Sequence, residues 1–230
     1  MTSSTYHVEK MNRDALAVPL KKRLLLIMLV CCIQLIYTPT SYRTIGGIEP
    51  KLPIDIFPIS SIWVLPYVLC YPLWISSLIW IVFKLEDRLF RALVAACSLT
   101  FSISTSTFIF FPTYVKAATL TGQDLFTNLL RFIHEHGGRY DAFPSGHVYI
   151  TMLLALFFSY QYPRYKYLCF SILAIVSVST LLTGQHYILD VLGGYAVALS
   201  GYHFGLWWAG LLPAGNRSNK KSRQLVRPPS

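Results

Sequence analysis

The feature that most constrains this chain is a series of long apolar segments. A helix needs about 20 mostly apolar residues to cross a bilayer. Six segments approach or exceed that length, at 20–38, 59–83, 92–111, 146–161, 166–183 and 187–211. Hydrophobic residues make up 54% of the chain and charged residues 13%, well below the roughly 25% charged residues of soluble proteins. These observations predict an all-α integral membrane protein, a bundle of six transmembrane helices.

The formal charge of +10 raises the question of a nucleic-acid partner. The basic residues do not form a stripe interleaved with aromatic residues. They cluster between the apolar segments and at the two ends, which is typical of a protein with several membrane spans. We therefore expect the lipid bilayer, and no nucleic acid, as a partner. The five cysteines lie inside apolar segments without CxxC spacing, so we interpret them as small buried hydrophobic residues.

The distribution of charge predicts an orientation. With six spans, 15 of the 20 Lys and Arg residues lie on the same side as both termini, which the positive-inside rule makes cytoplasmic. The first apolar segment lacks an A-x-A cleavage site at residues 37–40, so we read it as an uncleaved anchor. We expect a cytoplasmic N-terminal segment at 1–19, a membrane domain at 20–212 and a basic, disordered tail at 213–230.

The third outer loop, about 112–145, is the longest. Within it, residues 124–133 carry apolar side chains at 125, 126, 129, 130 and 133, which is helical spacing. This pattern predicts an amphipathic helix that lies in the membrane interface.

Two histidines are placed at the outer ends of predicted spans. His147 follows Pro144-Ser145-Gly146, and His186 precedes Asp190 by four residues. In a helix, side chains at i and i+4 share a face, so Asp190 is expected to hydrogen-bond one His186 nitrogen and leave the other exposed. An imidazole oriented in this way suits nucleophilic or general-base work. The Ser145-Gly146 turn places free N–H groups at a helix N-terminus, where phosphate binds well.

These residues carry a resemblance to a known family. Phe143-Pro-Ser-Gly-His147, followed by Ser179-Thr-Leu-Leu-Thr-Gly-Gln-His-Tyr-Ile-Leu-Asp190, resembles the PSGH and SRxxxxxHxxxD motifs of the type 2 phosphatidic acid phosphatase superfamily. Most of the chain is similar to its members, which have six spans with the motifs on one face. The segments Pro53–Ile59 and Phe111–Lys116 resemble its bacterial branch.

The resemblance implies a role for each matching residue. His186 would be the nucleophile that forms a phosphohistidine, Asp190 would orient it, and His147 would protonate the leaving oxygen. Ser145 and the Gly146 backbone would bind phosphate oxygens. The family needs no metal or other cofactor, and we interpret His134-Glu135-His136 as polar residues of the interface, because an H-x-H pair on a helix points in two directions.

Two motif positions depart from the family pattern. Thr180 stands where the third motif has Arg, and Lys116-Ala117 best matches the Arg-Pro end of the first motif. Lys116 would still act as a point charge at the phosphate, and Arg139 would supply the missing cation. The third-motif Arg is also absent from lipid phosphotransferases of the superfamily, such as sphingomyelin and inositol phosphorylceramide synthases.

The favoured function is a lipid phosphatase. It would cleave a phosphoester or pyrophosphate bond of a membrane lipid phosphate at the outer face of a bacterial cell membrane. The alternative is a phosphotransferase that passes the phosphoryl-bearing head group to an alcohol acceptor. Three other classes are alternatives: a cytochrome with haem bound by these histidines and His203, a transporter, and a protein with the fold but no activity. A haem ligand needs neither the preceding Pro-Ser-Gly nor Asp190, and a transporter would be expected to show repeats or broken helices.

Overall fold

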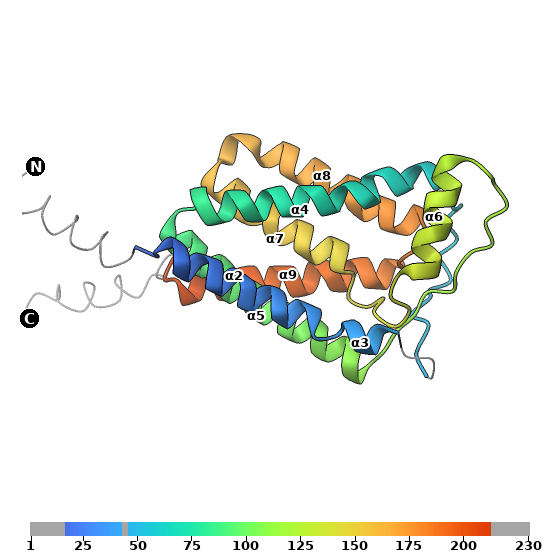
Figure 1. The fold of residues 1–230 in the computed structure, drawn as a ribbon, viewed down its shortest axis with the longest axis horizontal. Coiled ribbons are helices and arrows are strands. Elements are labelled where there is room, and N and C mark those ends of the chain that lie inside the picture. Colours follow the sequence, from blue (N-terminus) through green and yellow to red (C-terminus); the bar gives the residue numbers. More distant parts are fainter. Residues whose placement is uncertain (1–16, 43–45, 213–230) are drawn as a thin grey trace, which may run out of the picture.

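The computed structural model describes residues 17–42 and 46–212, and their regular structure is helical, without a strand. Each of the six apolar segments contains one long helix, and these helices run side by side along the longest axis (Figure 1). They are α2 (Leu20–Leu35), α4 (Val64–Lys84), α5 (Asp87–Phe110), α7 (Gly146–Gln161), α8 (Lys166–Leu182) and α9 (Ile188–Trp208). The short helices are α3 (Thr38–Ser41), η1 (Ser61–Trp63), α6 (Leu125–His136) and η2 (Pro163–Tyr165). The all-α prediction is confirmed.

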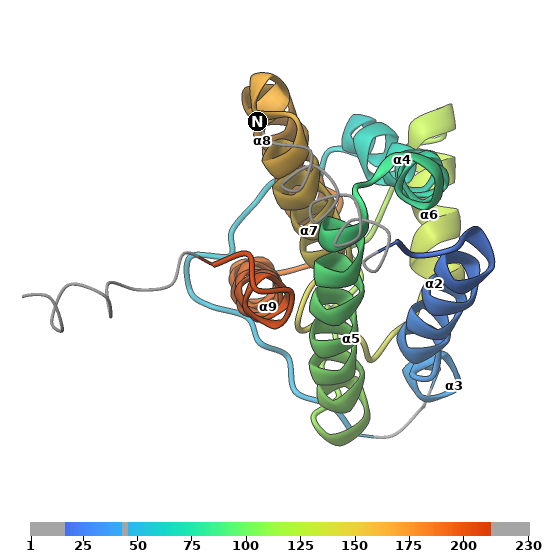
Figure 2. The same ribbon diagram turned by 90° about the vertical axis from the view of Figure 1, so that its left-hand side faces the viewer.

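Within the described residues, three helical segments are long and apolar enough to cross a membrane, which indicates a membrane protein. They are Ser61–Lys84, Asp87–Phe110 and Pro163–Leu182. Helices α2 and α7 have 16 residues each, a length of about 24 Å against the roughly 30 Å of a bilayer core. The count of six spans therefore stays a prediction, although all six long helices lie in one bundle (Figures 1 and 2).

Small residues bring α9 against α5, the two helices that pack most extensively in the bundle. A Cβ on Gly201 would lie 2.0 Å from Thr100 Oγ1, and one on Gly205 would lie 2.2 Å from the Ala92 carbonyl oxygen. A Gly-x-x-x-Gly pair permits such close backbone approach. The dispersion contacts made along this seam hold α9 in place, and with it the residues that lead into its N-terminus.

An ion pair closes the end of the bundle where α4 meets α5. The guanidinium of Arg23 lies 2.6 Å from Asp87 and donates to the carbonyl oxygens of Ile81, Val82 and Leu85. These carbonyls include the last ones of α4, which have no partner within the helix. Arg23 thereby joins α2 to the α4–α5 turn.

The opposite end of the bundle carries the predicted outer loops and is called here the α6 end, because α6 lies across it (Figure 1). Thr113 bridges two other segments there, since it pairs with Ile48 and with Asp141. Asp124 caps α6 by accepting from the N–H groups of Phe126 and Thr127. The expected helix in the third loop is thus present and reaches His136, while its position in a membrane interface stays a prediction.

The expectations for the chain ends fall largely outside the described residues. This holds for most of the N-terminal segment 1–19 and for the whole basic tail 213–230.

Candidate active site

The start of α7 positions His147 at the α6 end. Helix α7 begins at Gly146 with Ser145 as its N-cap residue, and the Ser145 N–H donates to the Asp190 carbonyl oxygen over 2.9 Å. This bond joins the Pro-Ser-Gly turn to α9. Two aromatic residues of α4 pack against the imidazole of His147. Tyr67 stacks on it with ring centroids 4.0 Å apart, and the ring centroid of Trp74 lies 5.3 Å from that of His147. The ring is therefore held between two helices.

The turn between α8 and α9 positions His186. Gly184 adopts a positive φ of 67°, which glycine tolerates without strain, and the N–H groups of Gln185 and His186 donate to the Thr180 carbonyl oxygen over 3.1 Å. His186 is buried, with only 8% of its side chain exposed. The turn thus presents an ordered imidazole beside α7.

The expected hydrogen bond between His186 and Asp190 is not formed in this structure. His186 Nδ1 lies 3.6 Å from Asp190 Oδ2, which is too long for a hydrogen bond. Helix α9 begins only at Ile188, so His186 precedes the first helical turn and the i, i+4 rule does not apply to it. Asp190 Oδ2 instead accepts from the Tyr187 N–H over 2.8 Å, as part of a capping box.

Several polar atoms at this place are buried without a hydrogen-bond partner. They include His186 Nδ1, His147 Nε2 and Asp190 Oδ1. Buried polar groups in proteins are nearly always paired, so unpaired ones call for an explanation. A polar ligand between the two imidazoles would account for the free His147 nitrogen. A small rotation of His186 would close its gap to Asp190.

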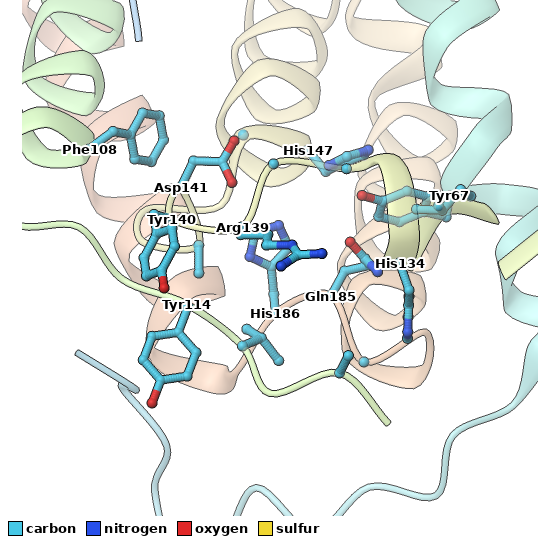
Figure 3. Close-up of a pocket in the computed structure, with 18 of the residues that line it drawn as sticks. Tyr67, Phe108, Tyr114, His134, Arg139, Tyr140, Asp141, His147, Gln185 and His186 are labelled. Carbon is cyan, nitrogen blue, oxygen red and sulfur yellow. The ribbon is translucent and has the colours of Figure 1, made fainter. Parts of the chain in front are cut away.

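Both histidines line one cavity of about 550 Å³ at the α6 end (Figure 3). Their rings stand edge to face with centroids 6.3 Å apart. Gly146, Lys116 and Arg139 line the same cavity. Lys116 and Arg139 are exposed, and in the described part of the chain neither one forms an ion pair. The structure therefore gathers two imidazoles, a helix N-terminus and two cations around one space.

Two residues singled out by the sequence lie away from this space. Ser145 is fully buried, its hydroxyl does not line the cavity, and it makes no hydrogen bond. A contact of its side chain with phosphate therefore stays a prediction, whereas its backbone N–H is already bonded to the Asp190 carbonyl oxygen. Thr180 is also fully buried, and its hydroxyl donates to the Ser177 carbonyl oxygen. The cavity receives no cation from that position.

The sequence reasoning missed Asp55, which supports the His186 turn. Its carboxylate is buried and accepts from the N–H of Ile188 over 2.9 Å and from that of Leu52 over 2.7 Å. Asp55 therefore ties the first outer loop to the first turn of α9. Nothing in its Pro-rich surroundings signalled this contact, which joins residues 133 positions apart.

His134, Gln185 and Asp141 also line the cavity without having been expected there. His134 Nε2 lies 2.9 Å from the Thr183 carbonyl oxygen and so links α6 to the turn that carries His186. Burial raises the pKa of the Asp141 carboxyl above its ordinary value, while positive charge on His186 opposes that shift. The position of Asp141 close before the Pro-Ser-Gly-His motif is the one sequence signal that pointed to it.

Within the described residues, no three His, Cys, Asp or Glu side chains form a group that could hold a metal ion. The expectation of a reaction without a metal or other cofactor stays a prediction.

The chain matches a model of a known protein family. The family model described as the PAP2 superfamily matches residues 59–204, which run from η1 into the last turns of α9 and include both histidines. No curated protein and no solved structure matches the chain.

Proposed function

Since this chain belongs to the PAP2 superfamily, we propose that it is a membrane enzyme that cleaves a phosphoester or pyrophosphate bond of a lipid phosphate. One observation carries this proposal: His147 and His186, 39 positions apart in the sequence, line one cavity together with Gly146 and two cations. A phosphoryl group bound there would have a nucleophile, an acid and counter-charges within reach.

In the first chemical step, His186 Nε2 attacks phosphorus, because Nδ1 is the nitrogen that faces Asp190. A nitrogen–phosphorus bond forms while the bond from phosphorus to the leaving oxygen breaks. His147 donates a proton to that oxygen, so the lipid alcohol leaves neutral. Asp190 stabilises the positive charge that develops on His186. The N–H groups at the start of α7, with Lys116 and Arg139, bind the phosphate oxygens.

In the second step, an acceptor attacks the phosphohistidine and His147 takes up the acceptor's proton. Water as the acceptor releases phosphate, which makes the protein a phosphatase. An alcohol as the acceptor makes it a phosphotransferase similar to sphingomyelin or inositol phosphorylceramide synthases. Thr180 supports this second candidate, because those enzymes also lack the Arg of the third motif at this position.

We also propose how the chain is oriented in the membrane. The six long helices would all span the membrane, and the two 16-residue helices, α2 and α7, would do so together with the residues that flank them. Both termini would lie in the cytoplasm and the cavity at the outer face, in a bacterial cell membrane. Helix α6 would rest in the outer interface. The membrane domain at 20–212 would then be the catalytic domain.

The function is tested on the full chain in detergent or nanodiscs. A panel of lipid phosphates and pyrophosphates is supplied with and without alcohol acceptors, and released phosphate and new lipids are followed together. Phosphate release without an acceptor supports the phosphatase. A new phospholipid formed only with an acceptor supports the phosphotransferase. No turnover of any donor with either acceptor would contradict both.

The nucleophile is tested by His186→Ala, which should abolish turnover and leave expression intact. Asp190→Asn should lose roughly 10²–10⁴-fold, as carboxylate loss does in comparable triads. His203→Ala is the matched control, because His203 lies on α9 but does not line the cavity. Near-normal activity in His186→Ala would refute the mechanism.

A further inference from the structure

The cavity contains one acidic side chain, Asp141, that the proposed mechanism does not use. A carboxylate beside a phosphate repels it, so the position of Asp141 is unexpected in an anion site. In the described part of the chain, no Lys or Arg lies within ion-pair distance of it. Its carboxylate packs over Gly138, where a Cβ would come within 2.4 Å of Oδ2. The Asp141 carboxylate thus packs closely into the cavity wall and, among the described residues, has no Lys or Arg as an ion-pair partner.

The surroundings of Asp141 are aromatic. Phe108 lines the same cavity (Figure 3), and the ring of Tyr37 packs against Phe108 with centroids 4.7 Å apart. Four tyrosines, Tyr37, Tyr67, Tyr71 and Tyr149, line the same cavity as Asp141. Aromatic faces attract organic cations such as quaternary ammonium groups, and an adjacent carboxylate adds to that attraction.

The ionisation of Asp141 would respond to a bound cation. Burial raises the pKa of this carboxyl and so disfavours its charged form. A positive ligand beside it would favour the charged form again and would gain a desolvated ionic contact.

The size of the cavity leaves room for such a group. A volume of about 550 Å³ falls within the roughly 300–1,000 Å³ of sites that hold whole organic ligands. From the cavity, Asp141 and the aromatic walls, we infer that this site takes a substrate with an ammonium group near its phosphate, bound between Asp141 and the tyrosines. This inference rests on the proposed phosphate site.

A different role for Asp141 would be to stabilise charge on His186, with which it interacts electrostatically. That role would affect every substrate equally, whereas an ammonium site affects only substrates that carry the cation. The two accounts therefore separate in a comparison of matched ligands.

The first experiment measures binding of two water-soluble probes by calorimetry to the full chain carrying His186→Ala, which removes the nucleophile and so prevents turnover of the probes. The probes are phosphocholine and 3,3-dimethylbutyl phosphate, in which carbon replaces the charged nitrogen. Phosphocholine should bind at least about tenfold more tightly, the size expected of a desolvated cation–aromatic contact. Equal affinities would overturn the inference. Because binding is read without catalysis, this result is independent of whether the protein turns over a lipid phosphate.

The matched variants locate the cation. Asp141→Asn should bring the affinity ratio of the two probes to near one. Lys116→Ala should weaken both probes by a similar factor, and Asp124→Asn, which makes the same change on exposed α6, should keep the wild-type ratio. A ratio unchanged in Asp141→Asn would overturn the role of this carboxylate.

A second experiment identifies which substrate carries the ammonium group. If it belongs to the donor, phosphatidylcholine or phosphatidylethanolamine should release diacylglycerol faster than phosphatidylglycerol does. If it belongs to the acceptor, phosphatidic acid should yield diacylglycerol together with phosphocholine or phosphoethanolamine when choline or ethanolamine is supplied, but no glycerol phosphate when glycerol is supplied. In either case Asp141→Asn should reduce the preference at least about tenfold. Indifference to the ammonium group in both arms would overturn the inference.

Discussion

At the scale of single residues, the role of His147 depends on the leaving group. A general acid matters most when the departing oxygen is strongly basic. His147→Ala should therefore reduce hydrolysis of a lipid alkyl phosphate far more than hydrolysis of an activated aryl phosphate. Steady-state rates on the two substrates measure the difference. Equal losses on both would mean that His147 does not act as the acid.

Lys116 and Arg139, the two cationic residues that line the cavity, are also expected to act as single residues. Bound phosphate carries up to two negative charges in a partly dry site, and such charge needs counter-charges. Lys116→Ala and Arg139→Ala should each lower turnover at least tenfold, or about 1.4 kcal/mol, whereas Lys116→Arg should be tolerated.

Lys51→Ala is the control for this pair, because Lys51 is an exposed cation of the first outer loop that does not line the cavity. If both cavity variants worked at wild-type rates, the phosphate would have to be bound by backbone N–H groups and other residues alone.

At the scale of elements, Asp55 joins the first outer loop to the start of α9. Asp55→Ala leaves the N–H groups of Ile188 and Leu52 without their acceptor. We expect a loss of about 1 kcal/mol in stability, as for other helix caps, and a lower kcat because the His186 turn loosens. Thermal unfolding and turnover of the same preparation measure the two effects.

Asp124→Ala provides the comparison, since it removes a cap of the same kind from α6. It should cost similar stability with a smaller loss of turnover. If both variants lowered kcat equally, Asp55 would not act through the position of His186.

At the scale of the whole molecule, the proposed orientation predicts which surfaces an impermeant thiol reagent reaches in intact cells. In a background without native cysteines, Lys51→Cys and Thr119→Cys should react from outside. Glu86→Cys and Arg164→Cys should react only after the membrane is opened. All four side chains are exposed in the structure, so burial does not confound the comparison. The reverse pattern would overturn both the topology and the outer-face site.

The sequence by itself determined where the long helices lie. A sufficiently long apolar segment directly indicates where a helix lies. The observed helices begin and end within a few residues of the predicted segments, with two exceptions. The segment predicted from 59 begins with an extended stretch before η1 and α4, and α5 begins earlier than the predicted residue 92. Asp87 and Arg88 extend α5 beyond the apolar run, because Asp87 pairs with Arg23 and favours the N-terminal turn. The two histidines were likewise found from sequence, since their motifs are short and local.

Only the tertiary structure decided how the site is arranged. The 3.6 Å gap between His186 and Asp190 depends on where α9 begins, and the burial of Ser145 depends on its backbone bond to Asp190. Asp55 is positioned by a contact with Ile188, which lies 133 positions further along the chain. Asp141 is positioned by pairing with Thr113, about 30 positions before it. Periodicity and motifs describe contacts within one turn or one helix, whereas these contacts arise when separate helices pack and bring their ends together.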